Sequence, residues 1–328
     1  MSNSKKQALQ VKALLWEKGQ SALEIAKQTV KREKIPSEPI KDSLNYFIDS
    51  WNDVVHPALL ALSCEAVGGK AEKTTQIGVA YILLAGGADI HDDIIDESSV
   101  KYSKKSVLGK FGKDIAILTG DALLFRGLYV LHEACENLPA KQKQLVLEVT
   151  MQAFFGISSA EAKESSLKTA GSIIAEDYLN MIKTKAAVAE ATMRIGAIIG
   201  GGLPQEIGVL ANFGKTFGTL LTIRDEFIDI FEIHELKNRA EREWLPLPIL
   251  YALKDPAKKE EILTLLKGGH ITKKAVELTR DIVIDSQETR QLKNEMRSMI
   301  QEQNKQFITI RNNQDKFKLM LDSTVEDI

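Results

Sequence analysis

Four aspartates stand close together in the segment Asp-Ile-His-Asp-Asp-Ile-Ile-Asp, residues 89–96. Asp92 and Asp96 are four residues apart, so a helix would place both carboxylates on one face, with Asp89 close to that face. Like charges at this spacing repel each other, so we expect a positive group to compensate them. Carboxylates are hard ligands that suit Mg²⁺, which commonly takes one or two of them. The segment therefore predicts a cation site.

A second acidic cluster, Arg-Asp-Glu-Phe-Ile-Asp, occupies residues 224–229. Asp225 and Asp229 repeat the four-residue spacing, and Glu226 lies between them. Apolar residues flank these acids, which is unusual for an exposed run of charges: Phe217, Leu220, Leu221, Phe227 and Phe231. Two acid pairs of this kind could face each other across a helical bundle and hold a metal cluster.

The main alternative is that both clusters are solvated faces of charged helices, which are common. Two clusters embedded in apolar helices make that alternative weaker than one cluster alone would. A calcium loop is disfavoured, because the acids follow a helical pattern and do not lie in a glycine-containing loop.

Helix-favouring stretches rich in Ala, Leu, Lys, Glu and Gln fill the chain between its eight prolines, and strand signals are nearly absent. The apolar spacing from Phe213 to Phe231 fits a helical stripe. We therefore predict an all-α fold, a single-domain bundle of ten or more helices over residues 1–328. Residues 1–35 should form an amphipathic N-terminal helix, and about 313–328 should fray.

Bulk properties exclude several classes of protein. The net charge is -2, which gives no basic surface for nucleic acid. No apolar run reaches the roughly 20 residues of a transmembrane segment. The two cysteines, Cys64 and Cys135, have no metal-ligand spacing. With no signal peptide, we expect a cytoplasmic location.

The two motifs in this order resemble those of the trans-prenyl diphosphate synthases, or polyprenyl synthetases. Asp92-Asp93-Ile94-Ile95-Asp96 is similar to the first Asp-rich motif of that family, and residues 225–229 to the second, with Glu226 in the middle place. Residues 109–112 and 117–124, the Lys183-Thr184 pair and Pro246-Leu247-Pro248 also resemble family segments. The resemblance covers roughly residues 50–270.

This resemblance implies a fold around a central cavity and a Mg²⁺-dependent prenyl transfer, with Mn²⁺ as an alternative ion. The metal ligands would be Asp92, Asp96, Asp225, Glu226 and Asp229, with Asp93 also catalytic. The metals would assist ionisation of an allylic diphosphate, whose cation isopentenyl diphosphate then attacks. Lys183 would bind diphosphate and Thr184 would face the cation. Without the family match, Lys183 and Thr184 would be read as an ordinary helical surface pair.

The departures from the family pattern gather on the isopentenyl diphosphate side. Lys70 is retained, but Lys73 stands for an arginine, Ala85 for a His or Gln, and Lys101-Tyr102 for an Arg-Arg pair. Lysine cannot make the bidentate phosphate contact of arginine. Each lost charged contact costs about 1.5–3 kcal/mol. Lys104 and Lys105 are candidates to compensate.

Two further substitutions concern the diphosphate and the prenyl chain. The two family lysines after the second motif have no clear match, and Lys237, Arg239 or Arg242 could replace them; a solvated charged loop is the alternative. Thr222 stands where the family has Gln.

Gly87 and Ala88 occupy the positions where aromatic residues close the family's prenyl pocket, so a long chain is expected. Close helix packing also selects small residues at such positions and remains the alternative.

Three functions remain open on the sequence. The first is elongation of an allylic diphosphate with isopentenyl diphosphate. The second is ionisation of an allylic diphosphate without isopentenyl diphosphate, followed by cyclisation, hydrolysis or transfer to another acceptor. The third is a non-catalytic subunit of a heteromeric synthase, which the two acid motifs argue against. By resemblance we expect a homodimer, with a heteromer as the alternative.

Overall fold

The computed structural model describes residues 3–101, 104–170, 173–242, 244–266 and 271–325, and no side-chain positions for 3–5, 167–170 and 241–242. Within these ranges the chain is helical apart from one short hairpin, β1 (Val100–Lys101) and β2 (Lys104–Lys105), in which Val100 pairs with Lys105. The prediction of an all-α bundle with ten or more helices is confirmed.

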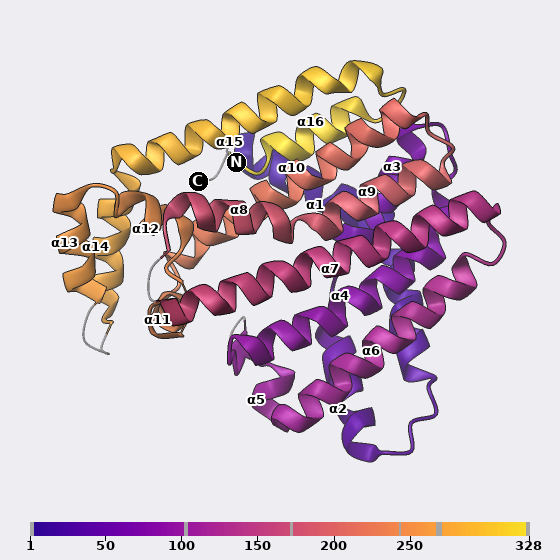
Figure 1. Ribbon diagram of the computed structural model, residues 1–328, viewed down its shortest axis with the longest axis horizontal. Helices are drawn as coiled ribbons and strands as arrows, with labels where there is room; N and C mark the ends of the chain where they lie inside the picture. Colours follow the sequence, from indigo (N-terminus) through magenta and orange to yellow (C-terminus); the bar gives the residue numbers. More distant parts are fainter. Residues whose placement is uncertain (1–2, 102–103, 171–172, 243, 267–270, 326–328) are drawn as a thin grey trace.

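The described helices follow the chain in this order: α1 (Asn3–Lys31), α2 (Glu38–Ser50), α3 (Val55–Ala66), η1 (Ala71–Thr74), α4 (Thr75–Ile95), α5 (Val107–Phe111), α6 (Lys113–Ala134), α7 (Ala140–Ala170), α8 (Ala175–Lys185), α9 (Ala187–Ile199), α10 (Pro204–Asp229), α11 (Ile233–Arg242), α12 (Leu247–Ala252), α13 (Pro256–Leu266), α14 (Lys273–Ile284), α15 (Gln287–Gln306), η2 (Phe307–Thr309) and α16 (Gln314–Asp322). Figure 1 shows α15 and α16 along one edge of the bundle and α5 and α6 at the opposite edge.

Prolines begin several of these helices, as their spacing predicts. Pro39 lies in the first turn of α2, Pro204 is the first residue of α10 and Pro256 the first of α13. Proline fits there because backbone N–H groups in the first turn of a helix have no intrahelical partner, so the N–H that proline lacks is not needed.

The C-terminal segment differs from the sequence prediction. Residues expected to fray form α16, in which Phe317, Met320 and Leu321 are fully buried. The prediction of a frayed tail is wrong for Gln314–Asp322, because the apolar residues of this short helix complete the core against α10 and α15.

The long helix α10 carries the second acidic motif and is anchored by aromatic packing. The rings of Phe213 and Phe217 stack with centroids 5.7 Å apart, and Phe317 lies 4.7 Å from Phe213. The predicted apolar stripe does not stay buried to its end: Ile228 and Phe231 are 42% and 52% exposed. The core therefore fixes the body of α10, whereas Asp225 is exposed and Asp229 half-buried near its C-terminal end.

Glycines allow α4, which carries the first acidic motif, to lie close to α6. A Cβ at Gly87 would stand 2.8 Å from the Gly120 carbonyl oxygen, and one at Gly127 would stand 2.8 Å from Leu84 Cγ. Such distances leave no room for a side chain. The first acid row is thus positioned by a tight helix–helix contact.

By length and composition alone, α6 could cross a membrane, and it is the one such helix in the described part of the chain. The prediction of no transmembrane segment is therefore not settled by that criterion. In this fold α6 packs along α4, and its Ala116, Leu123 and Leu131 are buried.

Candidate active site

The first acid row lies at the C-terminal end of α4. Asp92 and Asp96 are half-buried, and Asp93, on another side of the helix, is 5% exposed. Asp96 caps α4, and its backbone N–H donates to the Asp92 carbonyl oxygen. The predicted spacing thus brings Asp92 and Asp96 onto one accessible face.

A lysine compensates the other two aspartates of this row. Lys101 of β1 donates from Nζ to Asp89 Oδ1 at 2.7 Å and to Asp93 Oδ1 at 3.3 Å. This is the positive group that the repulsion between the acids required. Lys101, predicted to contact diphosphate, is bound to the protein's own carboxylates in this structure.

Asp92 has an environment that favours a bound cation. Burial, together with the negative charges of Glu161 on α7 and of Asp96, raises the pKa of Asp92 to about 7, against the opposing effect of Lys185. A carboxylate that is costly to ionise alone gains most from a divalent cation. Glu161 was not identified from the sequence.

Lys185, the last residue of α8, is the lysine that meets these acids. Its Nζ lies 2.8 Å from Glu161 Oε1 and 2.6 Å from Glu164 Oε2 of α7. Lys183 lies about 200° away around the helix, at roughly 100° per residue. Thr184 is exposed, and its hydroxyl donates to the Asn180 carbonyl oxygen.

The roles predicted for Lys183 and Thr184 stay predictions, and the position of Lys185 beside Glu161 and Glu164 favours that lysine instead. The spacing of buried residues along α8 could have indicated Lys185 from the sequence. Tyr178 and Ile182 are buried, and Lys185 continues their spacing of four and three residues.

The second acid row lies in the last turn of α10. Asp225 is exposed and Asp229 is half-buried. Burial and the neighbouring Glu226, Glu235 and Asp225 raise the pKa of Asp229 to about 7, although Arg239 opposes the shift. Asp225 and Asp229 can offer their carboxylates to a cation from one face, as the spacing predicts.

Glu226 is not available as a metal ligand, which corrects the prediction. Both of its carboxylate oxygens accept from Arg239 Nη2 at 2.8 Å, Oε1 accepts from the Tyr178 hydroxyl at 2.9 Å, and Oε2 accepts from the Leu247 backbone N–H at 2.8 Å. The residue is 4% exposed. Because Glu226 follows Asp225 by one position, the helix turns it about 100° from the acid face and into the core.

Side chains of α7 and α8 connect the two acid rows. Glu161 acts electrostatically on Asp92 and Asp96 and is ion-paired with Lys185. Two helical turns before Lys185 on α8 lies Tyr178, which reaches Glu226 of α10. The acids of α4 and α10 thus border one region that α7 and α8 line.

Lys70 and Lys73 lie away from this region. Both are exposed, just before and within η1, which immediately precedes α4. Asp92 is about 26 Å along α4 from the first residue of that helix, at 1.5 Å per residue. The predicted contact of Lys70 and Lys73 with isopentenyl diphosphate would place that substrate near the opposite end of α4 from the first acid row, so this geometry does not favour the contact.

The remaining predicted contacts have mixed outcomes. The Thr222 hydroxyl donates to the Gly218 carbonyl oxygen within α10. Lys237 is half-buried on α11. Tyr102 lies outside the described residues, and so does the side chain of Arg242. The two lysines of β2, Lys104 and Lys105, are exposed.

The two residues predicted to set the depth of the prenyl pocket have different surroundings. Gly87 is buried against Gly120 and Leu124 of α6, so close helix packing explains its small size. Ala88 is half-buried and lies one turn before Asp92. Ala88 remains a candidate for lining the pocket.

No group of three His, Cys, Asp or Glu side chains among the described residues is close enough to hold a metal ion alone. Each acid row supplies two carboxylates with half-exposed or exposed positions, a hard donor set that fits a divalent cation. Further oxygen ligands would have to come from water and substrate, as is usual for magnesium.

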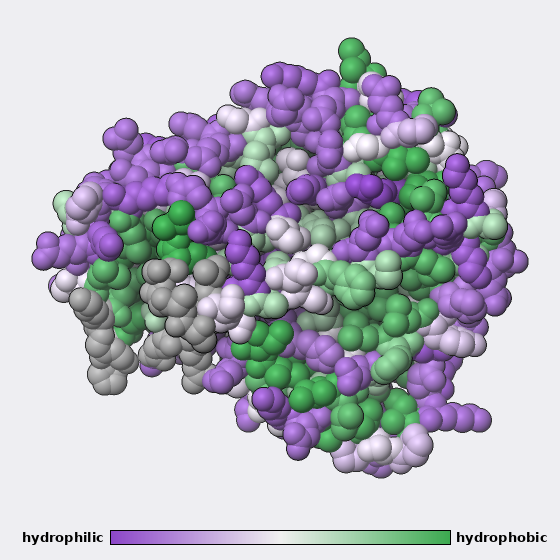
Figure 2. Space-filling model, viewed as in Figure 1, coloured by the Kyte–Doolittle hydropathy of each residue, from purple (hydrophilic) through white to green (hydrophobic). Residues whose placement is uncertain are grey.

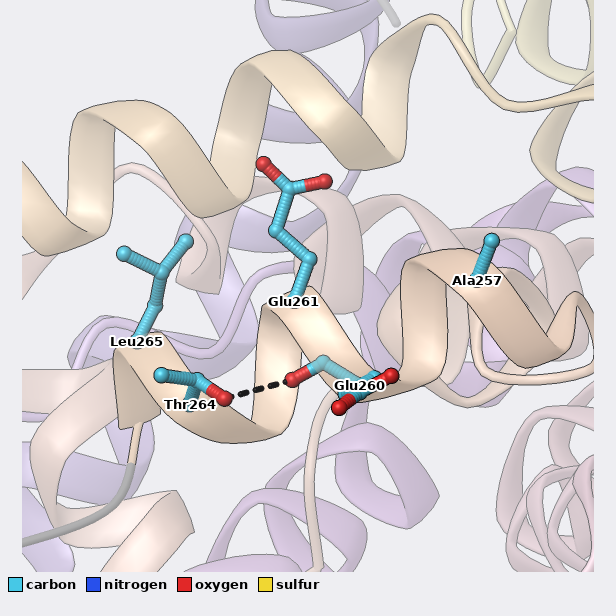
Figure 3. A pocket seen from close by; sticks show the side chains of 5 residues that line it. All are labelled: Ala257, Glu260, Glu261, Thr264 and Leu265. Atoms are coloured by element: carbon cyan, nitrogen blue, oxygen red, sulfur yellow. Dashed lines mark hydrogen bonds between the residues drawn. The ribbon is translucent and has the colours of Figure 1, made fainter.

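Figure 3 shows a hollow elsewhere on the surface, lined by Ala257, Glu260, Glu261, Thr264 and Leu265 of α13. The Thr264 hydroxyl donates to the Glu260 carbonyl oxygen of its own helix. No cation accompanies the two glutamates in this lining, and the hollow contains none of the predicted site residues.

Comparison with known proteins identifies the family of this chain. Residues 37–283 match the family described as polyprenyl synthetase. The chain is 28% identical over 245 residues to the short chain isoprenyl diphosphate synthase of Methanothermobacter thermautotrophicus, which is 72% of this chain and 74% of that protein. It is also 28% identical to the geranylgeranyl diphosphate synthase of Sulfolobus acidocaldarius over 54% of each chain.

The fold has close counterparts among solved structures. The geranylgeranyl pyrophosphate synthetase of Pyrococcus horikoshii superimposes with a TM-score of 0.85 over 98% of this chain and 99% of that one. At 21% identity this likeness concerns the fold. None of the three relatives is described as a cyclase, a hydrolase or a regulatory subunit, so the comparisons do not favour those alternatives.

Proposed function

Because the chain belongs to the polyprenyl synthetase family, we propose that it is a magnesium-dependent prenyltransferase. It condenses an allylic prenyl diphosphate with isopentenyl diphosphate and releases a prenyl diphosphate that is five carbons longer. The observation that carries the proposal is the pair of acid rows at the ends of α4 and α10, joined by Glu161, Lys185 and Tyr178.

Asp92 and Asp96 would hold Mg²⁺, and Asp225 and Asp229 would hold it as well. Mn²⁺ suits the same oxygen ligands. When bound at these acids, the cations would neutralise the negative charge that develops on the departing diphosphate. Among the described residues neither row offers a full set of ligands, so the remaining oxygens would come from water and the substrate.

Lys185 acts electrostatically on Asp92 of the first row and contributes positive charge to the diphosphate. In the ligand-free chain it is paired with Glu161 and Glu164, which keep its extended side chain beside Asp92. An ammonium group fixed in this way loses less conformational freedom when the substrate binds.

Isopentenyl diphosphate has fewer cationic partners than the family pattern provides. Ala85 and Tyr102 supply no charge, and Lys101 is already paired with Asp89 and Asp93. We expect weak binding of this second substrate.

Incubation with Mg²⁺ and geranylgeranyl diphosphate, with and without isopentenyl diphosphate, tests the function. Elongated product that requires both substrates and is lost in Asp92→Ala supports it. Asp114→Ala, which changes an exposed aspartate at the start of α6, is the matched control and should retain activity. Release of diphosphate without elongation would contradict the proposal.

We also propose a cytoplasmic homodimer, and a surface feature supports the dimer. An exposed apolar face covers α6 and α7, where Figure 2 shows hydrophobic residues gathered. Its members are Leu118, Phe125, Leu128, Tyr129, Met151 and Phe155, each more than half exposed. A second copy of the same face would cover it by twofold symmetry.

A further inference from the structure

A buried cluster of charged and polar groups surrounds Glu226 behind the second acid row. Arg239 of α11 donates from Nη2 to both Glu226 oxygens at 2.8 Å and to the Tyr178 hydroxyl at 2.7 Å. Its Nε donates to the Trp244 carbonyl oxygen at 2.7 Å. Glu226, Tyr178 and Arg239 are 4%, 5% and 9% exposed. Every contact is short, and the ion pair is almost fully removed from water.

Four segments meet at this cluster. Tyr178 comes from α8, Glu226 from α10, Arg239 from α11, and Leu247, whose N–H donates to Glu226 Oε2, begins α12. A buried charge must be paired, so loss of one partner leaves the other uncompensated and is strongly destabilising. The cluster therefore fixes the last turn of α10 relative to α8 and α11.

The same arginine also reaches the acid face. Arg239 Nη1 lies 3.6 Å from Asp229 Oδ2, so one guanidinium holds Glu226 on its inner side and stands beside Asp229 on its outer side. Asp229 follows Glu226 by three residues, less than one turn. The orientation of Asp229 is thus tied to the buried pair.

We propose that Arg239 is a positioning residue for the second metal site: held by Glu226 and Tyr178, it fixes Asp229 in the orientation in which that residue binds divalent cations. It contacts no substrate in this role. The inference rests on the proposed function, since it concerns the metal site of that reaction.

A purely structural role of Arg239 would affect stability and not metal binding. A control for this alternative lies at the other end of α10. Glu206 is 3% exposed and accepts from Arg311 at 2.7 Å and 2.9 Å, and from the backbone N–H of Leu203. This is also an arginine–glutamate ion pair, about 30 Å away along the helix, in which the Arg311 side chain is 51% exposed. Arg311→Met should destabilise the fold without reaching the metal site.

The experiment compares wild type, Arg239→Met, Arg239→Lys and Arg311→Met in two measurements. The first is the rise in Tm on adding Mn²⁺ and inorganic diphosphate, and the second is the Mg²⁺ concentration that gives half-maximal prenyl transfer. We expect both Met variants to lower the ligand-free Tm. Arg239→Met alone should lose at least half of the Tm rise and need at least tenfold more Mg²⁺, with partial recovery in Arg239→Lys.

Equal metal dependence in Arg239→Met and Arg311→Met, or a wild-type Tm rise in Arg239→Met, would overturn the inference. If Arg239→Met does not fold, Tyr178→Phe decides: it keeps both charges and removes one hydroxyl from the cluster. It should raise the required Mg²⁺ about threefold, and an unchanged requirement counts against the inference. If wild type itself shows no Tm rise, the proposed metal site fails together with the inference. If wild type and all variants show the same rise, only the inference fails.

Discussion

At the scale of single residues, the acids that the sequence singles out divide into two kinds. Asp92, Asp96, Asp225 and Asp229 are accessible and repeat on one face of a helix, whereas Asp93 and Glu226 are buried and paired with Lys101 and Arg239. The spacing of four residues identified the first kind. The same spacing turns Glu226 about 100° from the face of Asp225 and Asp229, but it could not identify Arg239, on another helix, as the partner of Glu226.

The position of Lys185 leads to a prediction with a built-in control. Lys185→Met should lower kcat by about 10–100-fold, because the ammonium group beside Asp92 is lost. Lys183→Met changes the same residue type two positions earlier, on the other side of α8, and should change kcat less than threefold. Steady-state kinetics at saturating Mg²⁺ measure both. Equal losses in the two variants would show that the face of α8 has been assigned incorrectly.

The raised pKa values of Asp92 and Asp229, each about 7, predict how stability depends on pH without metal. Between about pH 4 and 7 these carboxyls are ionised in the unfolded chain but largely protonated in the folded one. The unfolded state then binds fewer protons, so the free energy of unfolding falls as pH rises. Asp92→Asn should reduce this fall by on the order of 1–2 kcal/mol after allowance for solvent screening.

Chemical denaturation in EDTA at pH 5 and pH 8 measures the effect, with Asp114→Asn as the control. Added Mg²⁺ should restore stability mainly at pH 8, where the carboxylates are free to bind it. A wild-type protein that gains stability from pH 5 to pH 8 in EDTA by more than Asp92→Asn does would contradict this account.

At the scale of elements, Gly87 and Ala88 of α4 show that small residues can serve either helix packing or a pocket. Gly87 allows the helices to touch, and Ala88, the next residue, is turned about 100° from it and lies nearer to the Asp92 face. The sequence could not separate pocket from packing at either position, since both select small side chains. The answer depends on which helix lies opposite, and that is a long-range property of the fold.

Substitution by a large side chain separates the two roles. Gly87→Phe should lower stability by about 1–3 kcal/mol or prevent folding, because the new ring has no space against Gly120 and Leu124. Ala88→Phe should fold and shorten the main product by at least one five-carbon unit. Thermal unfolding and mass spectrometry of the products test the pair. Shorter products from Gly87→Phe with unchanged stability would reverse the assignment.

At the scale of the whole molecule, helical composition and proline spacing predicted the all-α bundle, and the helix over residues 1–35 corresponds to α1. The helix α16 was not predicted, because its three buried apolar side chains stand among polar residues in the sequence. The sequence also could not show that Lys70 and Lys73 lie at the opposite end of α4 from Asp92, because closeness in sequence does not give distance along a long helix. We propose that residues 1–328 form one domain, as the packing of α16 on α1, α10 and α15 favours.

The apolar face of α6 and α7 makes the oligomeric state testable. Phe125 and Phe155, 73% and 66% exposed, should be buried between two copies. Phe125→Glu should convert a dimer into a monomer, because it places a charge in an apolar contact. Light scattering coupled to size-exclusion chromatography measures the mass, with Ile308→Glu, a substitution at an isolated exposed apolar residue, as the control. A monomeric wild type, or a dimeric Phe125→Glu, would contradict the proposed dimer.

The central claim is that the acids of α4 and α10 bind divalent cations around one diphosphate. A crystal structure of the protein with Mn²⁺ and an allylic thiodiphosphate that resists ionisation tests it most directly, because anomalous scattering locates each manganese. We predict manganese ligated by Asp92 and Asp96 and by Asp225 or Asp229, with diphosphate oxygens between them and Glu226 still paired with Arg239. Manganese found away from both rows, or bound by Glu226 in place of Asp225 and Asp229, would contradict the account.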